Sequence, residues 1–332
     1  MSSETNSRGR LIAKVLISGD DHLKSSKKHG QHNDYGAESL YYFKMLGDYC
    51  IENEITHWIG LGDLTYGRFT SLEYRDKVEE ELSRQNKILN GNRWIIKGNH
   101  DRSSSGMTEY DYYLKKGYFK GSELLQIGPL NINMIDNKDK IKDYSTAPVL
   151  VEENKQNILL THGYFTFKGQ KLDFGESVLL DDMHNWYNCS LILCGHIHTK
   201  TVLEGFINDG KGNACKTTVC YLPCLSRPSY LEGRNPEFGQ VVVIEVYENY
   251  IDAQMKDIEL LPLEKSFNIE GIMAANKKEE LTSKLDLKDI VSQLDDYNFN
   301  VALNPEDVIM GMSEVPEKVR KRACEYIKQS YS

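Results

Sequence analysis

The chain has 332 residues, of which 40% are hydrophobic and 27% charged, and its formal net charge is −9. This composition is typical of a globular protein, and the length suits one large domain with an appendage or two domains. The sequence has no apolar run of roughly twenty residues and no signal-peptide core, so we expect a cytoplasmic protein that crosses no membrane. The acidic balance excludes nucleic-acid binding by overall charge alone, so a phosphate-bearing ligand would need a local metal cluster or basic patch.

The first half of the chain alternates short apolar segments with amphipathic ones. Strands are expected at residues 11–18, 56–63 and 93–101, and helices at about 35–53 and 71–89. This alternation predicts an α/β core with parallel strands.

After Tyr118 the pattern becomes rich in strands with little helix between them. The expected strands lie at residues 124–136, 155–163, 189–198, 201–206, 216–222, 240–246 and 251–260. An α/β half followed by a strand-rich half predicts two sheets packed face to face and flanked by helices.

The last part of the chain loses the strand pattern. Segments 277–298 and 305–332 predict short helices with charged faces, which would form either a packed appendage or a partner-binding module. We therefore expect a polar tail at 1–10, a main domain at 11–264 and a small helical module at 265–332.

The seven cysteines have irregular spacing. Cys215, Cys220 and Cys224 lack the second pair of a zinc ribbon, and two of them lie in an apolar run. Reduced thiols in a cytoplasmic protein are the better interpretation.

Five of the predicted strands stop at a short polar cluster. The clusters are Asp20-Asp21-His22, Gly62-Asp63, Gly98-Asn99-His100-Asp101, His162-Gly163 and Gly195-His196-Ile197-His198. Each cluster alone is weak evidence, because glycine and aspartate are common in turns. The carboxyl ends of strands in an open α/β sheet border the ligand crevice, so five clusters at that edge would converge.

A mixed set of oxygen and imidazole ligands suits manganese, iron or zinc. Two such cations about 3.5–4 Å apart form the centre that hydrolyses phosphate esters. Asp63 is the natural bridging carboxylate, and Asn99 would add a neutral amide oxygen. His100 could protonate the leaving oxygen, with Asp101 orienting it.

Successive side chains of an extended strand point to opposite sides, and this separates the residues of the first cluster. Asp20 and His22 are two residues apart and point to the same side, which favours both as ligands. Asp21 points the other way, and we expect it to be either a supporting residue or solvated.

The order D-x-H, GD, GNHD, H and GHxH resembles that of the calcineurin-like metallophosphoesterase superfamily over roughly residues 11–260. The resemblance implies a four-layer α/β fold, a double β-sandwich flanked by helices, with a small C-terminal helical appendage. It also implies two divalent metal ions, with manganese expected first and iron or zinc as alternatives, and His100 as the general acid. The implied ligands of one metal are Asp20, His22, Asp63 and His198, and those of the other are Asp63, Asn99, His162 and His196.

Within the superfamily, "NEITHWIGLGD", the GNHD turn, and "GHIHT" followed by "YLPCLSRPSY" look like the SbcD-type and phage recombination exonucleases. This resemblance implies a DNA nuclease, with a partner ATPase of the SbcC type and a possible homodimer. Three lysines after the first cluster could grip a nucleic-acid backbone beside the metals. They are Lys24, Lys27 and Lys28. The sequence "GDLTYGR" departs from the pattern usual in that branch.

Two other functions stay open. One is a phosphatase or phosphodiesterase acting on a small nucleotide or a phosphoprotein, with Arg68 and Arg102 as candidate phosphate contacts. The other is a non-catalytic scaffold that uses the fold to bind partners. The remaining histidines are expected outside the site, and they are His29, His32, His57 and His184.

Overall fold

The chain divides into two units, Met1–Phe267 and Asn268–Ser332. The computed structural model describes residues 9–26, 32–69, 71–103, 106–170, 177–227, 229, 239–274 and 317–330. Of the second unit, the described part comprises a helical segment at 269–274 and helix α10 (Glu317–Ser330). The helices expected at 277–298 lie outside the described residues.

The first sheet has five strands in the order β13-β12-β1-β2-β3. Their bounds are β1 (Leu11–Ser18), β2 (His57–Gly60), β3 (Arg93–Ile95), β12 (Gln240–Tyr247) and β13 (Ile251–Asp257). Strands β1, β2 and β3 are parallel, whereas β12 runs antiparallel to both β1 and β13. The carboxyl ends of β1, β2 and β3 therefore reach the same edge.

The second sheet has six strands in the order β10-β11-β9-β6-β5-β4. Their bounds are β4 (Leu124–Ile127), β5 (Leu130–Ile135), β6 (Gln156–His162), β9 (Leu191–Gly195), β10 (Thr201–Asn208) and β11 (Ala214–Tyr221). Strands β5, β6, β9 and β11 are parallel to one another, whereas the edge strands β4 and β10 run antiparallel to β5 and β11. The strand expected at 124–136 is instead the hairpin β4–β5. Gly128 has a φ of 51° and Pro129 carries no amide hydrogen, so the ladder cannot continue through them.

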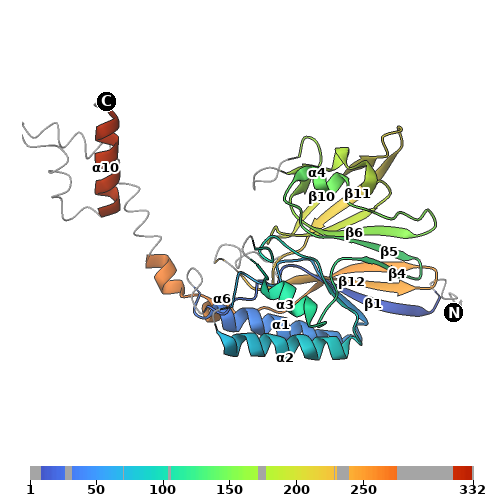
Figure 1. Cartoon of the computed structure of the whole chain (residues 1–332), viewed down its shortest axis with the longest axis horizontal. Helices are drawn as coiled ribbons and strands as arrows, with labels where there is room; N and C mark the ends of the chain where they lie inside the picture. The colour runs from blue at the N-terminus through green and yellow to red at the C-terminus, as the bar shows by residue number, and fades with distance from the viewer. Residues whose placement is uncertain are drawn as a thin grey trace, which may run out of the picture. The chain divides into compact units, whose positions relative to one another are not determined.

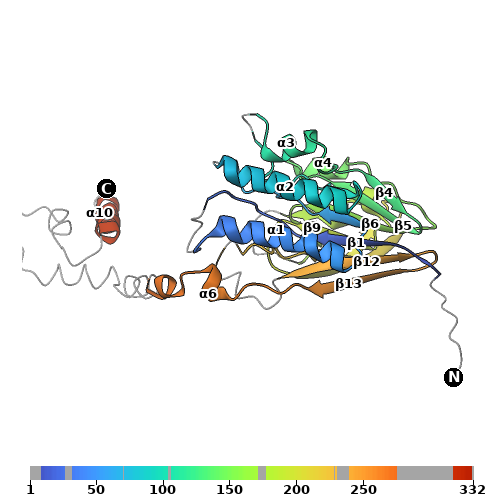
Figure 2. The same ribbon diagram turned by 90° about the horizontal axis from the view of Figure 1, so that it is seen from below.

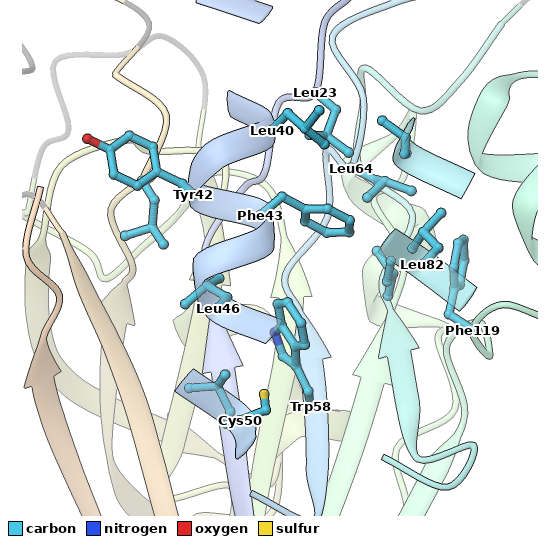
Figure 3. Close-up of a cluster of buried hydrophobic side chains, with 14 of the residues drawn as sticks. Leu23, Leu40, Tyr42, Phe43, Leu46, Cys50, Trp58, Leu64, Leu82 and Phe119 are labelled. Carbon is cyan, nitrogen blue, oxygen red and sulfur yellow. The ribbon is translucent and has the colours of Figure 1, made fainter. Parts of the chain in front are cut away.

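Helices α1 (Tyr35–Glu52) and α2 (Leu72–Ile88) cover the outer face of the first sheet (Figures 1 and 2). Each begins at a side-chain cap, because Asp34 accepts from the amide of Ala37 and Ser71 from that of Tyr74. Phe43 of α1 and Trp58 of β2 lie in the apolar layer between helices and sheet (Figure 3).

Shorter elements cover the outer face of the second sheet. They are α4 (Ile141–Ser145), β7 (Phe165–Thr166), β8 (Val178–Leu179) and the 3-10 turns η1 (Leu180–Asp182) and η2 (His184–Trp186). Trp186 and Phe165 are buried there against Leu159 of β6. A third apolar layer, which includes Val15 and Leu160, separates the two sheets. Three apolar layers between four structural layers confirm the predicted flanked double sandwich.

The remaining described helices are α3 (Glu109–Lys115), which follows β3, and α6 (Leu263–Ser266), near the end of the first unit. No helix in the described ranges has the length and apolar character needed to span a membrane. Among the described residues the seven cysteines form no disulfide.

A buried arginine joins α1 to the end of the first unit. The Arg227 guanidinium donates to Glu38 Oε1 at 3.0 Å and to the hydroxyl of Tyr42 at 3.1 Å. It also donates to the carbonyl of Leu261 at 2.8 Å and to the hydroxyl of Ser266. Its charge is therefore paired and hydrogen-bonded, which burial of an ion requires.

Candidate metal centre

The polar clusters of the two sheets meet where β1, β2, β3, β6 and β9 end. Their side-chain ligand atoms form three groups, each with all atoms within 4.8 Å of one another. The groups are Asp20–His22–His198, His22–Asp63–His100 and Asp63–His162–His196. The structure thus brings together residues that the sequence separates by up to 178 positions, from Asp20 to His198.

The first group combines one carboxylate with two imidazoles. His22 Nε2 lies 2.9 Å from His198 Nε2 and 3.7 Å from Asp20 Oδ2. His198 Nε2 lies 3.6 Å from the same carboxylate oxygen. Two imidazole nitrogens and a carboxylate oxygen facing one point are a donor set for a divalent cation.

The third group, Asp63–His162–His196, is oriented by a hydrogen bond behind it. His162 Nδ1 donates to the carbonyl of Leu61 at 2.9 Å, because that oxygen can only accept. In the neutral ring, Nε2 then carries the lone pair, and it lies 2.8 Å from Asn99 Oδ1 and 3.4 Å from Asp63 Oδ2. With the ring neutral, three electron-pair donors face one another, which fits a bound cation.

Asp63 lies between the imidazoles of the first group and those of the third. Its Oδ1 accepts from the backbone amide of His100 at 2.8 Å. Its Oδ2 is buried and has no hydrogen-bond partner among the described residues. That oxygen lies 3.9 Å from His22 Nε2 and 3.4 Å from His162 Nε2. Because a buried carboxylate oxygen without a partner is costly, the residues present fit a cation on either side of Asp63.

The charges of the centre are strongly coupled. Burial raises the pKa of Asp20 to about 6. Burial also acts to raise the pKa of Asp63, but the neighbouring His162 holds that pKa well below its usual range. Burial opposes a charge on His162, yet Asp63 and Asp20 raise its pKa to about 9. The same carboxylates would therefore attract either a proton on His162 or a metal ion in its place.

The backbone turns sharply at three of the clustered residues. Positive φ angles occur at His22 (47°), Asp63 (46°) and His196 (90°). Non-glycine residues rarely adopt this conformation, and such residues are concentrated at functional sites. These turns direct the side chains back toward the common edge.

Glycines next to the clusters leave room for their carboxylates. A Cβ atom on Gly98 would lie 2.0 Å from Asp63 Oδ1, and one on Gly195 would lie 2.4 Å from Asp20 Oδ1. The two turns therefore require glycine for close approach, which explains the G-N-H-D and G-H-x-H spacing.

Asp101 has a different role from the one expected. It is fully buried, and it accepts from the backbone amides of Leu64 (3.2 Å), Thr65 (3.1 Å) and Gly98 (3.1 Å). Its carboxylate thus ties together the turns after β2 and β3, and it does not orient the His100 ring. Burial raises the pKa of Asp101 to about 7.

Asp21 faces away from the clustered ligands, as expected, and it is buried rather than solvated. Its Oδ2 lies 3.7 Å from Nη2 of Arg93, whose guanidinium is fully buried and lies 3.7 Å from the Trp58 ring centre. Burial raises the pKa of Asp21 to about 7 in spite of this cation. Arg93 was not predicted from the sequence, where the available signal was a charged residue opening the apolar run "RWII".

The expected substrate contacts differ in their surroundings. Lys24 Nζ lies 4.3 Å from the centre of the Tyr66 ring, which contacts His100. Arg68 is exposed and borders a surface cavity of about 240 Å³, which is also lined by Arg75 of α2 and Glu109 of α3. Arg102 forms an ion pair with Asp139. Lys27 and Lys28 lie outside the described residues.

The other histidines have local roles, as expected. His57 stacks on Trp94 with ring centres 5.8 Å apart, and His32 packs on Phe267 at 4.1 Å. His184 lies at η2, where its ring bonds to a backbone carbonyl. His29 is outside the described residues.

Residues 13–200 match the family model of the calcineurin-like phosphoesterases. The chain belongs to this family. The expected superfamily is thus confirmed, and the family together with the Asp/His groups indicates a centre of two divalent cations.

Among solved structures, the calcineurin-like phosphoesterase chain is similar to a dimetal phosphatase from Danio rerio. The identity is 11% and the TM-score 0.43, over 76% of this chain and 98% of the other. A likeness at this level does not bear on the substrate. No curated protein sequence matches the chain.

Proposed function

We propose that this protein hydrolyses phosphate esters at a centre of two divalent cations. Asp20, His22, Asp63 and His198 would hold one cation, and Asp63, Asn99, His162 and His196 the other. The observation that carries the proposal is the buried Asp63 Oδ2, which lacks a hydrogen-bond partner in the described structure and lies between both imidazole groups. When bound, the cations would supply an activated water and positive charge for the phosphoryl oxygens.

His100 would donate the proton that the leaving oxygen requires. Its ring is half-buried and belongs to the group that includes His22 and Asp63, so it lies at the centre without being in either proposed ligand set. A donor in this position protonates the leaving oxygen as the ester bond breaks. The backbone amide of His100 is held by Asp63, which fixes the start of its side chain.

For the substrate we propose a nucleic-acid phosphodiester, with manganese as the metal. Lys24 supports this class, because a cation near the centre would attract a phosphate backbone in spite of the net charge of −9. The more specific prediction is a DNA nuclease in the cytoplasm that acts with a partner ATPase and forms a homodimer. A small nucleotide or phosphoprotein would be the substrate under the alternative.

The test is a side-by-side assay of manganese-loaded protein on linear DNA, RNA, bis-p-nitrophenyl phosphate and p-nitrophenyl phosphate. A nuclease would degrade at least one nucleic acid, and His100→Gln would lower that rate by about 10²–10⁴-fold with metal content unchanged. Cleavage of the nitrophenyl esters alone would favour the small-substrate alternative. Full metal loading without hydrolysis of any ester would contradict the proposal and favour a scaffold.

A further inference from the structure

The His100 ring is held by another ring. Its centre lies 4.5 Å from that of Tyr66, and the two planes are inclined by 24°. The His22 ring is at 5.3 Å and nearly perpendicular. Within the described part of the chain the His100 ring makes no hydrogen bond, and the carboxylate of Asp101 is occupied by backbone amides. Tyr66 is therefore the flat surface against which His100 rests.

Tyr66 is itself fixed by the first turn of the centre. Its amide donates to the carbonyl of Leu23 at 2.8 Å, and the amide of Leu23 donates to the carbonyl of Leu64 at 2.9 Å. The Tyr66 ring also lies 5.3 Å from the His22 ring. These contacts join the turn after β1 to the turn after β2, so the position of the Tyr66 ring is set by the same backbone that places the clustered ligands.

We propose that Tyr66 is the positioning residue for His100, and this inference rests on the proposed function of His100 as proton donor. Stacking restricts the rotation of the imidazole and keeps its plane in one orientation at the centre. A neutral aromatic ring does this without adding a negative charge beside the buried Asp63.

The chemistry gives a selective readout. His100 gives its proton to the leaving oxygen as the phosphorus–oxygen bond breaks, so the donor matters when that oxygen would leave as a basic alkoxide. p-Nitrophenolate is a weak base and leaves without a proton. A fault in positioning His100 must therefore slow alkyl esters and spare nitrophenyl esters, whereas general damage to the centre slows both.

The test compares Tyr66→Leu, Tyr66→Phe and His100→Gln with manganese bound. Two substrates are used: a methyl phosphodiester, which is an alkyl diester without a nitrophenyl group, and bis-p-nitrophenyl phosphate. We expect Tyr66→Leu to lower kcat on the alkyl diester by about three- to tenfold, with KM and the nitrophenyl rate unchanged. Tyr66→Phe keeps the ring and should behave as the unaltered protein. Tyr41→Leu, an exposed tyrosine on α1, is the matched control.

A second measurement does not depend on activity. In protein stripped of metal, the ring proton signals of His100, assigned by their loss in His100→Gln, should carry a ring-current shift from Tyr66. The shift should disappear in Tyr66→Leu and persist in Tyr66→Phe and Tyr41→Leu. An unchanged shift in Tyr66→Leu would overturn the inference.

The outcomes separate the two proposals. If His100→Gln is selective for the alkyl ester but Tyr66→Leu is unaffected, or slows both esters equally, positioning by Tyr66 is wrong and the proton donor stands. If Tyr66→Phe is as slow as Tyr66→Leu, positioning by Tyr66 is also overturned, because the aromatic ring would then not be the feature that positions His100. If His100→Gln slows both esters equally, the proton-donor role fails and the inference fails with it.

Discussion

The two sheets contribute different chemistry to the same centre. The turns after β1 and β2 supply both carboxylates, Asp20 and Asp63, together with His22, whereas the end of β6 and the turn after β9 supply imidazoles alone, those of His162, His196 and His198. The halves are joined by hydrogen bonds across the interface: His162 Nδ1 donates to the carbonyl of Leu61 at 2.9 Å, and the amide of His196 donates to Asp20 at 3.0 Å. The centre therefore exists only where the two sheets meet, with both carboxylates on one side and protonatable imidazoles alone on the other.

The largest effect is expected from removing the shared charge of the carboxylate half. Asp63→Asn keeps the shape of the side chain but loses the charge that both groups share, so both cations should be lost and turnover should fall to background. Metal analysis of the purified variant measures this directly. Asp139→Asn, an exposed aspartate remote in sequence from the clusters, is the control. Normal metal stoichiometry in Asp63→Asn would contradict the shared role.

A change of pH should act mainly on the imidazole half. The pKa of His162 is raised to about 9, so below that pH the ring is protonated when no cation is bound and must lose a proton to bind one. Manganese affinity should therefore fall as the pH is lowered, by up to about tenfold per pH unit. Titrations followed by manganese EPR at several pH values would measure the slope. An affinity independent of pH would show that metal binding does not displace a proton from His162.

A smaller effect is expected from crowding the carboxylate half. Gly98→Ala places a Cβ atom 2.0 Å from Asp63 Oδ1 and 2.3 Å from the Asp63 backbone nitrogen, so both the carboxylate and its turn must move. We expect manganese affinity to fall by about 10–100-fold, as for other changes beside a ligand, with the fold retained. Gly121→Ala is the matched control, because its nearest neighbour would be 3.7 Å away. Equal affinities in the two variants would show that this turn tolerates a side chain.

The smallest effect is expected outside both halves. Arg102 pairs with Asp139, whose side chain is 80% exposed, and such surface pairs contribute at most about 1 kcal/mol. Arg102→Ala should therefore change the free energy of unfolding little and turnover by less than about threefold. Denaturant unfolding and a nucleic-acid cleavage assay measure the two quantities. A large loss of cleavage would instead support Arg102 as the phosphate contact suggested by the sequence.

The sequence predicted the layers and the polar clusters because both depend on local patterns. The apolar segments that predict strands, and the polar residues that follow them, suffice to place Asp20 or His196 at a sheet edge. It could not predict the partners of Asp101 or Tyr66. Asp101 follows His100 directly, but the turn sends its carboxylate to the amides of Leu64 and Thr65, whose approach depends on how two turns pack. The β4–β5 hairpin was missed for a simpler reason, since its turn is the dipeptide Gly128-Pro129 within an apolar run.

The bonds of Arg227 have a practical consequence for shortening the chain. This guanidinium donates hydrogen bonds to both Leu261 and Ser266, and His32 packs on Phe267 beside it. A protein ending at Glu264 would lose Ser266 and Phe267, whereas one ending at Phe267 would keep every partner named. A fragment made to study the phosphoesterase apart from the second unit should therefore retain Phe267 as its last residue.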